Sequence, residues 1–197
     1  VVRGKVGIVN HGGKNGQGER AYNKKTGTRE WSGGSDRRSY TAPALRRVLG
    51  TNQVVIFDGV GIAGHSIEDG RENWKVKWSN DPQVNAAQPI VVSENQIFVG
   101  SGYGRGSGLI ELKEEKGRVK TNVKWSSRRV KLKFNAAVRK GNYAYGLDEG
   151  VLSCIDMLDG TLKWKRGRYG YGQLLLVQDT LVIQAEQGDI GFVRATP

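Results

Sequence analysis

The sequence predicts an all-β fold assembled from repeated units of four short strands. A glycine precedes a tryptophan by four residues at Gly27–Trp31, Gly70–Trp74 and Gly160–Trp164, and by eight at Gly117–Trp125. A small residue stands six positions before three of these glycines, namely Ala21, Gly64 and Cys154. A short polar residue stands four positions before the same glycines, namely Asn23, Ser66 and Asp156. Because the four tryptophans lie 39 to 51 residues apart, the period indicates an array of supersecondary units.

The elements between these markers have the pattern of strands. Short runs of β-branched and aromatic residues alternate with polar ones and are broken by Gly, Asn and Asp. The clearest copy has such runs at 90–92, 96–100, 109–112 and 123–125. Asp-Gly pairs at 69–70 and 159–160 close hairpins, and Lys25-Thr26-Gly27 makes the same turn. Residues 113–120 are charged and favour an extended hairpin loop over a helical turn.

Four strands in each unit of about 40–45 residues is the construction of a β-propeller blade. Complete blades are predicted at 36–82, 83–128 and 129–166. The unit at 1–35 is expected to lack its opening strand, and the unit at 167–197 its final one. We therefore expect an incomplete arc of about four to five blades from a longer protein. In the alternative, the two partial units combine and close a small ring.

The charge balance of the sequence indicates the class of partner but not the function. Lys and Arg number 31 against 19 Asp and Glu, which gives a formal charge of +12. Such a balance favours acidic partners, either a protein or another acidic surface. The single Cys154 excludes an internal disulfide, and no apolar run is long enough to form a transmembrane helix.

The pattern small-x-polar-x-x-x-Gly-x-x-x-Trp resembles the repeat of the pyrroloquinoline-quinone (PQQ) type propellers. The segments 21–31 and 154–164 carry it most clearly, and 64–74 carries a weaker copy. The resemblance implies a propeller in which each tryptophan packs against a neighbouring blade. It also implies export to the periplasm or the cell exterior. The family includes PQQ- and calcium-dependent dehydrogenases, but also non-enzymatic members that assist outer-membrane assembly.

From this resemblance we expect a non-catalytic scaffold or binding module. The alternative is part of a PQQ-dependent dehydrogenase whose cofactor site lies largely outside this segment. No cofactor is predicted, and PQQ and calcium would enter only with that alternative. The dehydrogenases often carry a disulfide of adjacent cysteines, which one cysteine cannot form, and no Asp, Glu and Asn cluster matches their calcium site.

Two glycine-rich stretches, 12–18 and 100–108, are candidates for ligand contact. Strands are expected on both sides of each, so they are interpreted as elongated hairpin connections rather than phosphate cradles. Three residues in or beside them are the candidate loop contacts: His11, Tyr103 and Arg105. His65 is expected to pack or face solvent, and Cys154 to be a buried thiol rather than a nucleophile.

Basic runs occur at 46–47, 128–133 and 163–168. Alternation of Lys with Leu and Val predicts a solvated face of outer strands, where lysines also discourage pairing with other chains. An interaction surface is the alternative. Binding of nucleic acid is not favoured, since it would need exposed aromatic side chains and the tryptophans are committed to packing.

Overall fold

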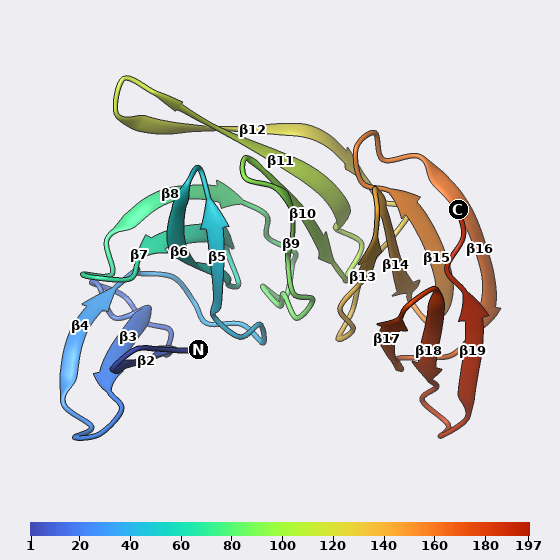
Figure 1. Ribbon diagram of the computed structural model, residues 1–197, viewed down its shortest axis with the longest axis horizontal. Coiled ribbons are helices and arrows are strands. Elements are labelled where there is room, and N and C mark those ends of the chain that lie inside the picture. Colours follow the sequence, from blue (N-terminus) through green and yellow to red (C-terminus); the bar gives the residue numbers. More distant parts are fainter. The chain divides into compact units, whose positions relative to one another are not determined.

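The computed structural model describes residues 1–197, with every side chain except that of Arg3. Within these residues every regular element is a β-strand, which confirms the predicted all-β fold. The strands form five sheets that follow one another along the chain (Figure 1). In each sheet the strands lie side by side in chain order, as they do in propeller blades.

The first sheet contains β1 (Val2–Arg3), β2 (Val6–Asn10), β3 (Glu19–Asn23) and β4 (Arg29–Gly33). The second contains β5 (Ala44–Val48), β6 (Thr51–Phe57), β7 (Gly61–Ser66) and β8 (Glu72–Lys77). The third contains β9 (Ile90–Ser93), β10 (Gln96–Ser101), β11 (Gly106–Glu115) and β12 (Arg118–Ser127). The fourth contains β13 (Val138–Lys140), β14 (Tyr143–Asp148), β15 (Val151–Asp156) and β16 (Leu162–Arg168). The fifth contains β17 (Gln173–Val177), β18 (Thr180–Gln184) and β19 (Ile190–Arg194).

One expectation from the sequence is corrected in the first sheet. The unit at 1–35 was expected to lack its opening strand, but β1 occupies that place and pairs antiparallel with β2. The strand has only two residues, Val2 opposite Gly7 and Arg3 opposite Val6. Two residues are too few to show the alternation by which a strand is recognised in a sequence.

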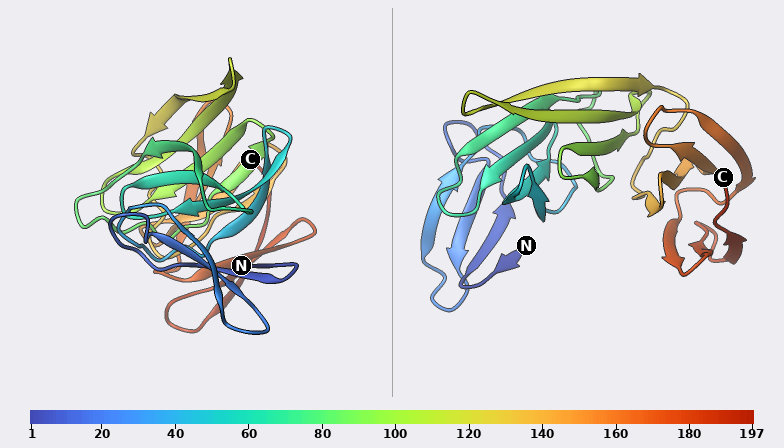
Figure 2. Two further views of the ribbon diagram at one scale, coloured as in Figure 1. Left: turned by 90° about the vertical axis from the view of Figure 1, so that its left-hand side faces the viewer. Right: turned by 45° about the horizontal axis from the view of Figure 1, so that its top comes forward.

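The charged segment 113–120 lengthens a hairpin, as expected, but it does so as strand rather than loop. Strands β11 and β12 have ten residues each, and only Lys116 and Gly117 separate them. Figure 2 shows this hairpin in yellow-green from two further sides. Gly117 has a φ of +73°, the left-handed conformation that the turn requires.

The chain divides into two compact units. Unit 1 comprises residues 1–85, 93–95 and 112–121, and unit 2 comprises 86–92, 96–111 and 122–197. In unit 1, a core cluster joins Ile8 and Ala21 of the first sheet to Val54 and Ile56 of the second. In unit 2, Tyr145, Leu152 and Cys154 of the fourth sheet pack with Leu181 and Ile183 of the fifth.

Tryptophans link consecutive sheets within each unit. In unit 1, Trp31 of β4 donates from Nε1 to the carbonyl oxygen of Ile67, at 2.9 Å. In unit 2, Trp125 of β12 donates to Met157 at 3.0 Å, and Trp164 of β16 donates to Thr196 at 2.9 Å. Each indole therefore fixes its own sheet to the backbone of the next while its ring covers apolar side chains.

Trp74 departs from this rule and bonds within its own sheet. Its Nε1 donates to Oε1 of Gln53 on β6, at 3.0 Å. The marker glycine of the next repeat, Gly117, stands at the tip of the long β11–β12 hairpin. No atom lies within 4 Å of its Cβ position, so no tryptophan ring rests on it. The stretched spacing in the sequence thus coincides with a changed tryptophan contact.

The polar residue of the repeat caps the turn that leads to the glycine. Asn23 Oδ1 accepts from the backbone N–H of Lys25 at 3.0 Å, and Asp156 Oδ1 accepts from that of Leu158 at 3.0 Å. Ser66 Oγ accepts more weakly from the N–H of Asp69, at 3.3 Å. A short oxygen-bearing side chain is suited to this place because it satisfies turn N–H groups two or three residues ahead.

The small residue of the repeat lies opposite the tryptophan. Ala21 pairs with Trp31, Gly64 with Trp74 and Cys154 with Trp164 across the third and fourth strands. A Cβ on Gly64 would lie 2.3 Å from Nε1 of Trp74, so the indole folds directly over this position. The Cys154 side chain is fully buried, and burial raises the pKa of its thiol to about 11.

Candidate functional site

Two of the three predicted loop contacts lie on one turn of unit 2. Tyr103 and Arg105 stand between β10 and β11, where Arg105 donates its backbone N–H to the carbonyl of Gly102 at 3.1 Å. Tyr103 has a φ of +54°, so the turn places its side chain from a left-handed backbone. The ring is 37 % exposed, and the guanidinium of Arg105 donates to Ser126 Oγ at 3.2 Å.

The ring of Tyr103 forms one side of an aromatic pair around a cation. Nζ of Lys133 lies 4.8 Å from the centroid of Tyr103 and 4.9 Å from that of Tyr171. Lys133 comes from the connection between β12 and β13, and Tyr171 from the connection between β16 and β17. Three separate segments of unit 2 therefore meet at one ammonium group, each contact contributing about 0.5–1 kcal/mol at an exposed site.

A glycine determines where this lysine lies. A Cβ on Gly102 would stand 2.8 Å from Cβ and 3.0 Å from Cγ of Lys133, so the aliphatic stem rests on the bare backbone. Beside Lys133, Phe134 adopts a φ of +57°, and its carbonyl accepts a bond from Nε2 of Gln173 at 3.0 Å. We call Tyr103, Arg105, Lys133 and Tyr171, together with Arg128, the aromatic–basic surface.

Positive charges gather at the aromatic–basic surface. Burial, and secondly the positive charge of Arg128, lower the pKa of Arg105. Arg128 and Arg129 are exposed, and neither forms an ion pair with any side chain that the structure describes. Lys131 is different, because its Nζ lies 2.9 Å from Glu149, which is the first cause that raises its pKa. The surplus charge is thus carried by arginines and Lys133.

The structure changes the interpretation of the basic runs. Residues 128–133 were expected on an outer strand, but they form the connection between β12 and β13. Their alternation arises because Val130 and Leu132 enter the core, while Arg128 and Arg129 are exposed and Lys131 and Lys133 are half-buried. Residues 163–168 do belong to β16, an outer strand, whereas Arg46 and Arg47 lie on β5, the first strand of its sheet.

His11, the third predicted loop contact, belongs to unit 1. It lines a pocket of about 710 Å³ formed by the loop between β2 and β3 and the connection between β4 and β5. Its Nδ1 lies 3.0 Å from the carbonyl oxygen of Gly12. His65, by contrast, is 2 % exposed on β7, and burial lowers the pKa of its imidazole.

Buried carboxyl groups lie beside this pocket. Glu19 is 2 % exposed, and burial, aided by Asp58 and Asp36, raises its pKa to about 8. Asp58 accepts from the backbone N–H groups of Val60 and Gly61 at 2.7 and 2.9 Å, yet burial still raises its pKa to about 6. Asp36 is paired with Nζ of Lys75.

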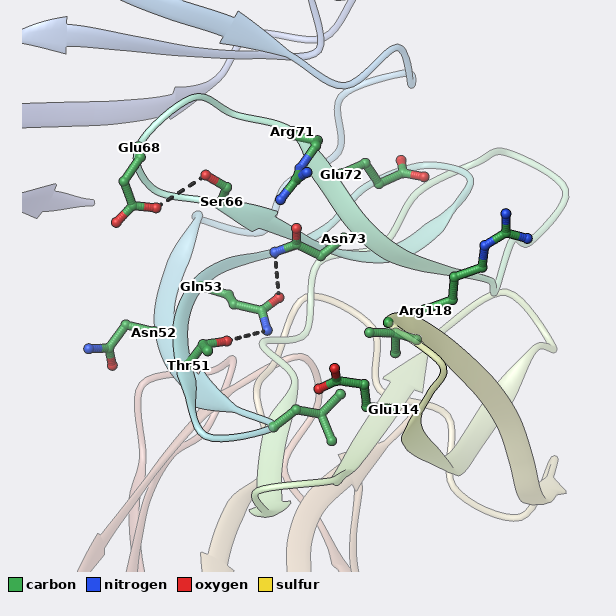
Figure 3. A pocket seen from close by; sticks show the side chains of 13 residues that line it. Thr51, Asn52, Gln53, Ser66, Glu68, Arg71, Glu72, Asn73, Glu114 and Arg118 are labelled. Atoms are coloured by element: carbon green, nitrogen blue, oxygen red, sulfur yellow. Dashed lines mark hydrogen bonds between the residues drawn. The ribbon is translucent and has the colours of Figure 1, made fainter.

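A second hollow of unit 1, of about 670 Å³, lies between β6–β8 and the tip of the long hairpin (Figure 3). Gln53 stands in it, accepting from Asn73 and donating to Thr51. Glu114 and Arg118 enter from the hairpin. The wall mixes both signs of charge with side-chain amides, an arrangement that selects no single class of ligand.

The described residues contain no group of three or more His, Cys, Asp and Glu placed to hold a metal ion. The one cysteine of the sequence, Cys154, is buried. The described residues also contain no helix with the length and hydropathy of a membrane span.

Sequence reasoning missed Lys133 and Tyr171 as partners of Tyr103. A signal was present, since both follow the tryptophan of their repeat by seven or eight residues and so occupy the same connection. Arg37 and Arg38 follow Trp31 at a similar distance and line the pocket of His11. The connections after the fourth strand thus supply these side chains repeatedly.

The repeat geometry has a counterpart among known families. The profile of the outer membrane protein assembly factor BamB family matches residues 1–166. The chain belongs to this family. BamB-type chains are PQQ-like β-propellers, which confirms the predicted fold and the resemblance of the repeats.

Solved structures agree at the level of the fold. BamB from Moraxella catarrhalis matches with a TM-score of 0.65 and 18% identity over 93% of this chain and 60% of that one. The chain therefore spans about three fifths of that BamB. The computationally designed Ika4 protein matches with a TM-score of 0.55 and 17% identity over 87% of this chain and 100% of that one. No curated protein is similar enough in sequence to count as a match.

Proposed function

We propose that this BamB-family chain is a non-catalytic protein-binding module that receives an acidic segment of its partner on the aromatic–basic surface. The observation that carries the proposal is Lys133 held between Tyr103 and Tyr171 beside Arg128 and Arg105. Tyrosine and arginine are the residue types that contribute most to protein interfaces, because they combine a rigid apolar body with directional donors.

Family membership supports the proposal from another side. A factor that assembles other proteins works by contact, and a propeller presents its loops on rigid blades. We include in the proposal that the protein is exported to the periplasm, where assembly of outer-membrane proteins takes place. The blade boundaries at 36–82, 83–128 and 129–166, and an incomplete arc within a longer protein, stay predictions.

Binding to synthetic peptides tests the partner class. A fluorescent ten-residue peptide rich in Asp and Glu is titrated with the chain, and a peptide with Asn and Gln in their place is the control. We expect saturable binding of the acidic peptide only, weakened about tenfold by Lys133→Met, which keeps the stem and removes the charge. Lys24→Met, in the turn after β3, is the matched control.

Two results would contradict the proposal. Equal affinity for the acidic and the neutral peptide would show that the surface does not select acidic segments. Equal loss in Lys133→Met and Lys24→Met would show a general effect of net charge rather than this surface. Export is tested separately, by following an epitope-tagged chain after osmotic shock of its native cells; retention with the cytoplasmic marker would refute it.

A further inference from the structure

The pocket of His11 in unit 1 has the features of an anion-binding site that the proposed function does not use. Lys14 enters it from the loop between β2 and β3, and Arg37 and Arg38 enter from the connection between β4 and β5. All three side chains are exposed, and none of them forms an ion pair with a described side chain. Three cations therefore share one hollow of about 710 Å³.

The backbone around these cations is fixed from both sides. Gly13 donates its N–H to the carbonyl of Asp36 at 3.1 Å, and Gly16 donates to Ser35 Oγ at 3.0 Å. Gly59, in the turn between β6 and β7, donates to the carbonyl of Arg37 at 2.9 Å. The connection is thus held between two loops before any ligand arrives, which lowers the ordering cost of binding.

The backbone and the Cβ of Arg38 pack directly against Gly12. A Cβ on Gly12 would lie 2.5 Å from Cβ and 2.6 Å from the backbone nitrogen of Arg38. The φ of Gly12 is +71°, so the position requires glycine for its conformation as well as for space. The glycine-rich loop at 12–18, interpreted from the sequence as a hairpin connection, therefore lies directly against an arginine of the connection between β4 and β5.

The carboxyl groups near the pocket are buried or paired. Asp36 in its wall is paired with Lys75. Glu19, buried behind the connection, is mostly protonated at neutral pH because burial raises its pKa to about 8. Asp58 is buried, and its carboxylate accepts from the backbone N–H groups of Val60 and Gly61. The exposed charged side chains that line the pocket, apart from His11, are therefore the cations Lys14, Arg37 and Arg38.

We propose that this pocket binds the phosphate groups of a small phosphorylated ligand carrying two or more negative charges. Planar guanidinium groups donate in pairs to phosphate oxygens, and a lysine adds a point charge from another direction. The volume exceeds that of a single phosphate, so the pocket has room for a diphosphate or for a phosphate with its attached group. A soluble phosphate ester and the phosphorylated head group of a lipid share this chemistry.

Calorimetric titration with inorganic pyrophosphate at low salt tests the site on the full chain. We expect saturable binding that weakens as salt is raised, and about tenfold weaker binding in Arg37→Gln and in Lys14→Gln. These two are chosen because the stem of Arg38 packs on Gly12 and its exchange would disturb the loop. Arg29→Gln, an exposed position on β4 outside the pocket, is the control.

Absence of saturable pyrophosphate binding would overturn the proposal, as would equal loss in the Arg29→Gln control. Sedimentation with phosphatidylcholine vesicles, with and without phosphatidic acid, then separates the two sources. Binding to the phosphatidic acid vesicles that Arg37→Gln abolishes assigns the site to a lipid head group. Pyrophosphate binding without vesicle binding assigns it to a soluble ester. The result is independent of the acidic-peptide experiment, because the pocket and the aromatic–basic surface have no residue in common.

Discussion

The indole ring of Trp125 lies against Gly160, the marker glycine of the following repeat. A Cβ on Gly160 would stand 2.7 Å from Cδ2 and Cε3 of that ring. Trp31 has the same relationship with Gly70 in unit 1, at 2.4 Å from Cε3. The glycine and tryptophan that lie four residues apart in the sequence are therefore not contact partners. Trp31 and Trp125 are each matched to the glycine one repeat further along, whereas Trp74 is not matched to Gly117.

This relationship predicts that Gly160→Ala is more destabilising than an equivalent change at Gly117. Both residues have a similar φ, +76° and +73°, so alanine meets about 1 kcal/mol of backbone strain at either. Only Gly160 also has a ring against it, and the clash raises the expected total to about 2–4 kcal/mol. Urea denaturation followed by tryptophan fluorescence measures both; equal losses would show that the ring contact contributes nothing.

The bond from Trp125 to the backbone of the next sheet has its own test. Trp125→Phe keeps most of the apolar ring but leaves the carbonyl of Met157 without its 3.0 Å donor. We expect a loss of about 1–2 kcal/mol. The comparison is Trp74→Phe. This variant loses a bond to the side chain of Gln53 rather than a bond to the backbone of the next sheet. A larger loss at Trp74 would contradict the role assigned to backbone anchoring.

The raised pKa of Glu19 predicts that the free energy of unfolding falls as pH rises. Its folded pKa, about 8, lies above the ordinary 4.5, so folding favours the protonated form. The contribution is complete below pH 4.5 and is lost progressively towards pH 8, at no more than about 1.4 kcal/mol per pH unit. Asp58 adds the same sign of change between pH 3.8 and about 6.

Denaturation midpoints between pH 5 and 8 compare the native chain with Glu19→Gln and with the exposed-site control Glu114→Gln. We expect the Glu19 variant to lose much of the decline between pH 6 and 8, and the control to retain it. An unchanged slope in Glu19→Gln would exclude this carboxyl as the cause.

Gly102→Ala tests the support beneath Lys133. The new methyl would enter the space of the lysine stem, 2.8 Å from its Cβ, and displace the ammonium from the two tyrosines. We expect weaker binding of the acidic peptide by about fivefold to tenfold, together with a loss of about 1–3 kcal/mol in the free energy of unfolding from the same clash. Gly7→Ala on β2 is the control, since its φ is not left-handed and the nearest atom to its Cβ position is the carbonyl oxygen of Tyr22 at 3.9 Å. Equal binding by both variants would contradict a positioning role.

Cys154 is expected to resist alkylation in the folded chain. Its side chain is fully buried, and a pKa of about 11 leaves little thiolate at pH 8. Mass spectrometry after treatment with iodoacetamide should show modification only in denaturant. Rapid modification of the native chain would contradict the packing described.

The sequence predicted the features that depend on local chemistry. Turn glycines with positive φ and the oxygen-bearing cap of Asp156 act within a few residues, so their spacing revealed the repeat. The connection at 128–133 was misread because one side of it packs on the core. An extended segment joined to its neighbour by a single β-bridge, Leu132 with Asp148, then alternates like a strand.

The candidate surface was predicted only in part for the same reason. Tyr103 and Arg105 stand in a glycine-rich turn that could be recognised locally. Their neighbours Lys133 and Tyr171 come from connections 30 and 68 residues beyond Tyr103, and only the packing of successive sheets brings them together. No spacing rule inside a single repeat contains that information.

The bond between Trp74 and Gln53 has a consequence for how the array tolerates insertions. Trp31 and Trp125 each rest on a marker glycine and donate to the carbonyl three residues before that glycine, Ile67 or Met157. Gly117 stands at the tip of the lengthened hairpin, and Trp74 donates to the side chain of Gln53 instead. Gln53 lies on β6, the second strand of the sheet that contains Trp74. The longer hairpin of the third sheet is therefore compensated by a side chain of the second sheet. The repeats of this chain are therefore interdependent, and we expect a hairpin lengthened in another repeat to require a substitute acceptor for the preceding indole.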